Sequence, residues 1–167
     1  MNPKGEVEFQ DAAPGTYEVL AGTSTKAYSV VGIASGDSET RGHTLTVPEG
    51  ASLTVSLSLV EGKVNVEGHA KHAGKPASGA MIVLVPKDPE ANHELFRRDQ
   101  SDLDGSFTLR SVVPGSYTLI AIDDGWDLDW AKPAVLAPYL KHGQAIKVED
   151  QTRVALHVPD AVEVQKK

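Results

Sequence analysis

Apolar and polar residues alternate along many short stretches of the chain. Val7 and Phe9 alternate with two glutamates, and residues 53–59 (LTVSLSL) alternate throughout. Because successive side chains of a strand point to opposite faces of a sheet, this pattern buries one face and leaves the other in water. No stretch of ten or more residues keeps a helical period, and residues 89–96 are compatible with one helical turn at most. The pattern predicts an all-β, antiparallel protein.

Two stretches one hundred residues apart resemble each other. Residues 5–21 (GEVEFQDAAPGTYEVLA) and 105–121 (GSFTLRSVVPGSYTLIA) share their first glycine, a Pro-Gly pair, a tyrosine and the final alanine. Farther along, residues 53–59 match residues 154–158 at an offset of 101, which fits one residue of drift in a loop. Such a duplication predicts two copies of one β unit.

The second copy contains more expected strands than the first. In the second copy we expect strands near 63–71, 79–86, 94–100, 105–111, 115–123, 143–149 and 152–158. The first copy begins at the fourth of these and adds expected strands near 27–34, 43–48 and 52–60, so its opening strands are missing. The predicted organisation is a partial β-sandwich over 1–61, a complete seven-stranded β-sandwich over 62–160 and a polar tail over 161–167, with Glu61–Gly62 as the junction.

Each copy carries one Pro-Gly-x-Tyr corner. Proline fixes φ and glycine provides a freely turning position, so the two residues join strands at a tight corner. The tyrosine then enters the edge of the core with its hydroxyl free to meet a backbone group, as in a tyrosine corner. The predicted structural residues are Pro14, Gly15, Tyr17, Pro114, Gly115 and Tyr117.

These motifs resemble the carboxypeptidase regulatory-like domain family. Residues 66–86 (VEGHAKHAGKPASGAMIVLVP) resemble the family's opening strand and G-x-P-x-x-G-A-x-V pattern. Residues 102–119 (DLDGSFTLRSVVPGSYTL) resemble its D-x-x-G-x-F and P-G-x-Y-x-L patterns. The resemblance implies tandem immunoglobulin-like (prealbumin-like, starch-binding-like) sandwiches, the first incomplete. It also implies a module of a secreted, periplasmic or cell-surface bacterial protein, and it carries no catalytic residues.

Composition and charge exclude several classes of function. A net charge of −7 without a stripe of lysine and arginine argues against nucleic-acid binding. The chain has no cysteine, so disulfides, thiolate metal sites and cysteine nucleophiles are excluded. Apolar runs are too short for a transmembrane helix, and no apolar run follows the first residues, so we expect neither membrane insertion nor a signal peptide in this chain. The basic doublet Arg97–Arg98 is interpreted as a charge-paired strand edge.

Catalytic motifs are lacking in the sequence. It contains no G-x-S-x-G nucleophile elbow and no glycine-rich phosphate loop, so we expect neither an enzyme nor a cofactor. Four aspartates of one segment (Asp123, Asp124, Asp127 and Asp129) do not follow the spacing of an EF-hand, and His69 and His72 would lie on opposite faces of a strand. We therefore predict no metal site.

The segment 123–139 contains both tryptophans and four aspartates, which makes it the candidate ligand site. Exposed aromatic rings stack on sugars, and neighbouring carboxylates accept hydrogen bonds from sugar hydroxyls. The candidate residues are Trp126, Asp127, Asp129, Trp130 and Tyr139. The alternative interpretation is structural, with both tryptophans pinning a long loop against the sandwich.

The sequence leaves three functions open. We favour a non-catalytic structural or interaction module, whose partner is another protein, a second copy or a neighbouring domain bound through open sheet edges of the first copy. The second is a carbohydrate-binding module that uses residues 123–139, with a glycan as partner. The third is an accessory domain of a larger enzyme.

Overall fold

The structure is a computed structural model that describes residues 5–22, 28–35, 38–41, 43–150 and 155–167. The chain divides into two compact units. Unit 1 comprises residues 1–21 and 30–59, and unit 2 comprises residues 22–29 and 60–167. The second boundary lies within three residues of the junction expected at Glu61–Gly62.

Unit 2 is a β-sandwich with nine strands among its described residues. Its strands are β6 (Val64–His72), β7 (Lys75–Pro76), β8 (Met81–Pro86), β9 (Arg97–Gln100), β10 (Ser106–Val112), β11 (Gly115–Ile122), β12 (Gln144–Val148), β13 (Ala155–His157) and β14 (Val162–Gln165). Two short 3-10 helices, η1 (His93–Leu95) and η2 (Gly125–Asp127), and one α-helix, α1 (Pro133–Leu140), complete the unit.

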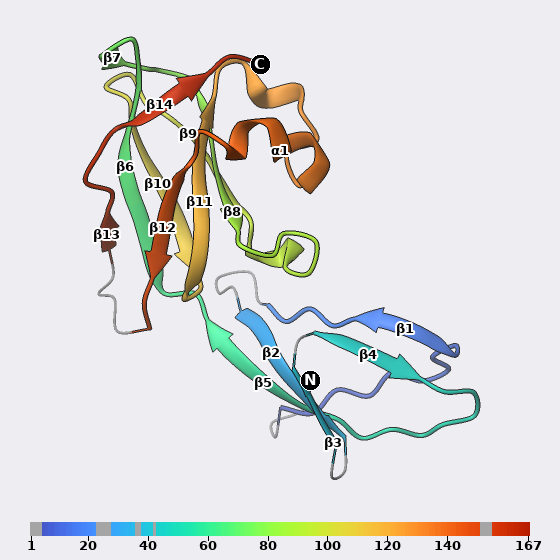
Figure 1. The fold of residues 1–167 in the computed structure, drawn as a ribbon. Helices are drawn as coiled ribbons and strands as arrows, with labels where there is room; N and C mark the ends of the chain where they lie inside the picture. Colours follow the sequence, from blue (N-terminus) through green and yellow to red (C-terminus); the bar gives the residue numbers. More distant parts are fainter. Residues whose placement is uncertain (1–4, 23–27, 36–37, 42, 151–154) are drawn as a thin grey trace. The chain divides into compact units, whose positions relative to one another are not determined.

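The strands of unit 2 form two layers (Figure 1). One layer is centred on β6, which pairs antiparallel with β10 and β7 and parallel with β13. The other layer has the order β9-β8-β11-β12, with antiparallel ladders throughout. Strand β14 pairs parallel with both β6 and β11 and therefore joins the two layers.

The main core lies between the two layers. Val66 of β6 and Leu109 of β10 pack with Leu84 of β8 and Leu119 of β11, and all four are buried. A second apolar cluster lies on the other face of the β8–β11 sheet, where Leu136 of α1 packs against it. Strand β8 is thus buried on both faces, which explains why residues 81–85 are a continuous apolar run instead of an alternating one.

The all-β sandwich is confirmed, but several sequence expectations for unit 2 are wrong. A helix, α1, forms where a loop was expected, and β14 forms within the expected polar tail 161–167. Val162 and Val164 point into the core, so the last strand is part of the sandwich. Not every ladder is antiparallel, because β13 and β14 pair parallel with β6. The first residues of the expected strand 152–158 lie outside the described part of the chain.

Unit 1 contains two small sheets instead of a sandwich. Strand β1 (Gly15–Glu18) pairs with β4 (Thr44–Val47), and a second sheet has the order β3 (Ser38–Arg41), β2 (Tyr28–Ser35), β5 (Ser56–Glu61). The first two residues of β2 and the last two of β5 are assigned to unit 2. No strand forms over residues 5–14, so the alternation of Val7 and Phe9 does not produce the expected strand. Residue 27, where we expected β2 to begin, lies outside the described residues.

The sequence repeat is preserved in one strand pair of each unit. In unit 1 Gly15 lies opposite Val47 and Tyr17 opposite Leu45. In unit 2 Gly115 lies opposite Val148 and Tyr117 opposite Ile146. The two registers differ by a single residue, as the offsets of 100 and 101 predicted.

Candidate functional site

The segment 123–139 covers the outer face of the β8–β11 sheet in unit 2 (Figure 1). Asp124, with a left-handed backbone, starts η2, and Pro133 occupies the first turn of α1, where its missing N–H leaves no hydrogen bond unmade. Leu136 is fully buried against Val83 and Ile120. Packing on the sheet thus fixes the position of the candidate ligand residues.

The two tryptophans share one arginine. The guanidinium carbon of Arg98 lies 5.2 Å from the ring centroid of Trp126 and 4.8 Å from that of Trp130. Trp130 also meets Phe96 edge to face at 6.3 Å, and the Trp126 indole N–H donates to the Gly79 carbonyl at 3.0 Å. Both rings are therefore engaged in contacts within the protein.

Both candidate carboxylates have lysine partners. Asp129 pairs with Lys132 at 2.6 Å, and Asp127 pairs with Lys167. The hydrogen bond from Lys167 lowers the pKa of the Asp127 carboxyl, and the hydrogen bond to Asp129 raises the pKa of the Lys132 ammonium. These pairs are exposed to solvent, so they add little to stability.

The structure brings Trp126 and Trp130 against the same arginine and does not form an open aromatic platform from the candidate residues. Tyr139 is half-buried in the cluster beneath α1, and its carbonyl accepts a hydrogen bond from the Gln165 amide. Trp126 is the most exposed of the three rings, with 38% of its surface in solvent. These contacts favour the structural interpretation of the tryptophans.

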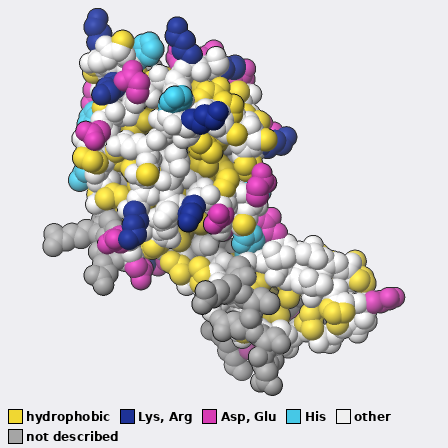
Figure 2. Space-filling model, in the orientation of Figure 1, with side chains coloured by type: hydrophobic (Ala, Val, Ile, Leu, Met, Phe, Trp, Pro, Cys, Tyr) yellow, Lys and Arg dark blue, Asp and Glu magenta, His cyan; other side chains and the backbone are white. Residues whose placement is uncertain are grey.

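Helix α1 is apolar on all sides. Its sequence is PAVLAPYL, and only Leu136 is fully buried. Figure 2 shows hydrophobic side chains gathered on the surface of unit 2 over this helix. The exposed residues of the helix, Ala134, Ala137 and Pro138, are small and apolar.

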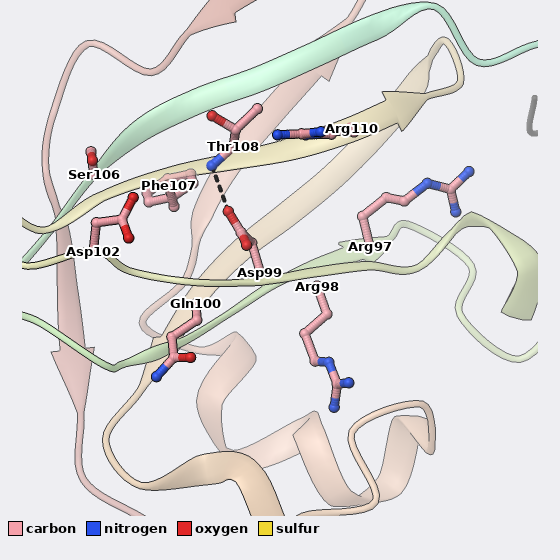
Figure 3. A pocket seen from close by; sticks show the side chains of 9 residues that line it. All are labelled: Arg97, Arg98, Asp99, Gln100, Asp102, Ser106, Phe107, Thr108 and Arg110. Atoms are coloured by element: carbon pink, nitrogen blue, oxygen red, sulfur yellow. Dashed lines mark hydrogen bonds between the residues drawn. The ribbon is translucent and has the colours of Figure 1, made fainter. Parts of the chain in front are cut away.

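A groove of about 510 Å³ separates β9 from β10 in unit 2 (Figure 3). These strands are the edge strands of opposite layers. The Asp99 carboxylate accepts a hydrogen bond from the Thr108 N–H at 2.7 Å. The Arg97 guanidinium donates to the Ser111 carbonyl at 3.0 and 3.2 Å, at a bulge where Ser111 has a φ of 54°.

These two side chains cap the free edge of β10. A strand edge with unpaired N–H and C=O groups invites another strand, and side-chain hydrogen bonds to those groups oppose such pairing. Burial lowers the pKa of the Arg97 guanidinium, with neighbouring Glu94 acting in the opposite direction. The Arg97–Arg98 doublet is therefore not simply a charge-paired edge: Arg97 caps carbonyls and Arg98 lies against the tryptophans.

Sequence reasoning missed the role of Arg98, although a signal was present. Neighbouring residues of a strand point to opposite faces, so Arg97 and Arg98 of β9 serve different surfaces. Figure 3 shows Arg98 pointing toward the helical segment and away from Arg97 and Arg110. An arginine directed at a segment with two tryptophans is a candidate cation–π partner.

Both tyrosine corners form the same local hydrogen bond. The Tyr117 hydroxyl donates to the Val113 carbonyl at 2.7 Å, and the Tyr17 hydroxyl donates to the Ala13 carbonyl at 2.6 Å. Pro14 and Pro114 precede the strands that carry these tyrosines. Gly115 does not adopt a positive φ, contrary to its expected turning role; a Cβ there would lie 3.3 Å from the Tyr117 ring. The absent side chain lets the ring lie against the backbone.

The histidines and aspartates that were considered as metal ligands lie in different parts of unit 2 and are exposed. His69 and His72 are exposed on β6, and Asp123 and Asp124 are exposed at the end of β11.

Among the described helices, none is long and apolar enough to cross a membrane.

Residues 59–148, more than half of the chain, match a family model described as "BOS complex subunit NOMO1-like, second beta sandwich domain". The carboxypeptidase regulatory-like assignment is not confirmed, whereas the β-sandwich that it implied is. No curated protein sequence matches this chain.

One solved structure was also found to be similar, a variant of BcpA, the major pilin subunit of Bacillus cereus. It is 9% identical, with a TM-score of 0.38, and the match covers 89% of this chain and 40% of that chain. A likeness at this level supports no conclusion about fold or role.

Proposed function

The chain belongs to the family of NOMO1-like second β-sandwich domains, and from this premise we propose that it is a non-catalytic structural and interaction module. The observation that carries the proposal is the engagement of the polar and aromatic groups in the 123–139 segment. Arg98 occupies the space beside both tryptophan rings, and Asp127 and Asp129 are paired with lysines. In this segment, the aromatic rings and carboxylates are thus in contact with other side chains of unit 2.

Several features of unit 2 make it a rigid domain. Its main core is closed between two layers, its second core is covered by α1, and the edge of β10 is capped. A module of this kind can space or present neighbouring parts of an assembly. The apolar outer face of α1 is the proposed contact surface of unit 2.

A carbohydrate-binding role is the second candidate, and the exposure of Trp126 favours it. A glycan array with the full chain separates the two roles. We expect no binding by the wild-type chain. Binding that is lost in Trp126→Ala and kept in Leu103→Ala, a change at an exposed turn residue of the same unit, would establish the glycan role and end the structural proposal.

We also propose that the chain acts outside the cytoplasm, at the surface or in the envelope of a bacterial cell. The support is the motif resemblance to domains of secreted proteins. Protease treatment of intact cells that express the full-length protein tests this: cleavage is expected, and protection until lysis would contradict it.

A further inference from the structure

Strand β9, at the edge of its layer in unit 2, directs alternate main-chain groups away from its one partner strand, β8. The N–H and the C=O of Ser101, the residue after β9, both bond on the β8 side. Because alternate residues of an antiparallel pair bond to the partner strand, Arg97 and Asp99 also bond to β8. The N–H and C=O groups of Arg98 and Gln100 therefore point to the free edge of β9.

The free edge of β9 differs from the facing edge of β10, which is capped. On β10 the Thr108 N–H is bonded to the Asp99 carboxylate, and the Ser106 N–H is bonded to the carboxylate two residues earlier. For the edge groups of Arg98 and Gln100, the described residues provide no hydrogen-bond partner. Both residues line the groove between the two strands, although their side chains point to the other face of β9 than that of Asp99 (Figure 3). The groove thus has an unpaired strand edge along one wall.

Three of the five arginines in the sequence also line this groove. In the described part of the chain, the exposed Arg110 guanidinium has no hydrogen-bond or ion-pair partner, and the Arg98 guanidinium contacts only the two tryptophan rings. Arg97 donates to main-chain carbonyls, and the Glu94 carboxylate favours its charge from beyond ion-pair distance. Four lysines of unit 2, by contrast, form ion pairs with carboxylates: Lys63, Lys132, Lys147 and Lys167. The groove therefore holds guanidinium groups that are open to the carboxylates of a ligand.

Two aspartates of the groove, Asp99 and Asp102, restrict where such carboxylates fit. Successive side chains of an added strand would lie on opposite faces of the sheet. A residue opposite Arg98 would share the face of Arg98, and its neighbour opposite Arg97 would share the face of Arg97. Since opposite charges stabilise cross-strand pairs and like charges destabilise them, acidic residues are favoured opposite both arginines and disfavoured opposite Asp99.

We propose that this groove binds an acidic, extended segment of a partner protein, which adds to the free edge of β9 as a further antiparallel strand. Main-chain hydrogen bonds to Arg98 and Gln100 attach the segment. One acidic side chain binds Arg98, and the next binds Arg97 and Arg110 on the opposite face. The same arginines repel basic strands, so the charges that protect the edge from indiscriminate pairing also select the partner.

The test uses the full chain and a fluorescent peptide, VTTKEEVT, whose lysine lies opposite Asp99 and whose glutamates lie opposite Arg98 and Arg97. Anisotropy is expected to show saturable binding that weakens as salt is added. Amide hydrogen exchange followed by NMR is expected to slow at Arg98 and Gln100 when the peptide binds. The amides of Arg97 and Asp99, which already bond to β8, are expected to change little.

Two altered peptides separate the ionic contribution from the main-chain contribution. Replacing both glutamates with glutamine is expected to weaken binding at least about tenfold, because charge-assisted hydrogen bonds are lost. N-methylation of the two peptide residues opposite Arg98 and Gln100 removes the strand hydrogen bonds and is expected to abolish binding.

Variants of the protein locate the site. Arg110→Gln is expected to weaken binding about tenfold, whereas Lys141→Gln, which removes an exposed cation outside the groove, has no effect. Arg110→Lys keeps the charge and is expected to bind more tightly than Arg110→Gln. Equal weakening by both changes at Arg110 would contradict the ionic contact.

Four further results would overturn the proposal. These are no binding of VTTKEEVT, equal binding of the glutamine peptide, equal binding of the N-methylated peptide, and slowed exchange elsewhere with none in β9. Equal binding of the N-methylated peptide would make the groove a site for carboxylates without strand addition.

The groove is a different surface from the proposed contact face of α1. Glycan binding through Trp126 would end the structural proposal for unit 2 and leave strand addition at β9 intact. Absence of peptide binding would leave the proposed function with α1 as its contact surface.

Discussion

In unit 2 the ring of Tyr117 is enclosed by the sandwich, with 3% of the residue exposed, whereas in unit 1 the ring of Tyr17 is 39% exposed. Both hydroxyls nevertheless donate to the carbonyl four residues earlier, and both strands keep the same register with their partner. The local sequence is sufficient for the corner and for one strand pair. Burial of the corner requires strands β6 and β8, which come from a distant part of the chain.

The contrast also separates two kinds of exposed edge. In unit 2 side chains of β9 cap the free groups of β10, so that unit needs no further strand. In unit 1, residues 5–10 form no strand although their sequence alternates as residues 105–110 do. An alternating sequence is therefore not sufficient to form a strand, because a partner strand is also needed.

The largest difference is expected from truncating the paired positions Leu109 and Phe9. Leu109→Ala leaves a cavity between the layers of unit 2 and is expected to lower the free energy of unfolding by about 2–5 kcal/mol. Phe9→Ala removes a side chain already in water and is expected to change it by less than about 0.5 kcal/mol. Scanning calorimetry of the full chain measures both. Equal losses would show that Phe9 is packed in solution and would end the comparison.

The next effect is a loss of stability at alkaline pH that comes from Tyr117. Burial raises the pKa of the Tyr117 hydroxyl to about 12, against about 10 in an unfolded chain. The folded state therefore keeps this proton longer, so its contribution is complete below pH 10 and is lost as the pH rises from about 10 to 12. It amounts to at most about 2–3 kcal/mol.

Urea unfolding of the wild type and of Tyr117→Phe, compared at pH 8 and pH 11.5, isolates this contribution from other alkaline titrations. The difference between the two proteins is expected to shrink at the higher pH. A constant difference would mean that the hydroxyl titrates normally.

The smallest effect is the loss of the two corner hydrogen bonds themselves. Tyr117→Phe leaves the Val113 carbonyl buried without its partner, so we expect a loss of about 1–2 kcal/mol at pH 7. Tyr17→Phe leaves the Ala13 carbonyl open to water, and a loss below about 0.5 kcal/mol is expected. Denaturation midpoints of the two variants sharpen the comparison, and a larger loss in Tyr17→Phe would reverse it.

The sequence predicted the β-sandwich because most strands of unit 2 alternate and are bounded by turn residues. It did not predict α1, because PAVLAPYL is apolar on all sides and includes Pro138, so it has no helical period. Strand β14 was missed because Val162 and Val164 are its only two core positions. The expected strand at the start of unit 1 does not form, and among the described strands none pairs with residues 5–11.

The candidate site was predicted less well than the fold. The 123–139 segment was selected by composition, and two of its residues, Trp126 and Trp130, lie against the same arginine. The composition of the segment does not reveal its contacts with Arg98 of β9 and with Lys167 at the end of the chain. Whether rings and carboxylates face a ligand or each other depends on such distant contributions.

Strand β14 pairs with β6, the first strand of unit 2, and with β11 of the other layer. The pairing with β6 joins residues about 90 positions apart in the sequence, and contacts of such high sequence separation slow folding. A chain cut short before Val162 would keep most of its apolar residues and lack the strand that fastens one layer to the other.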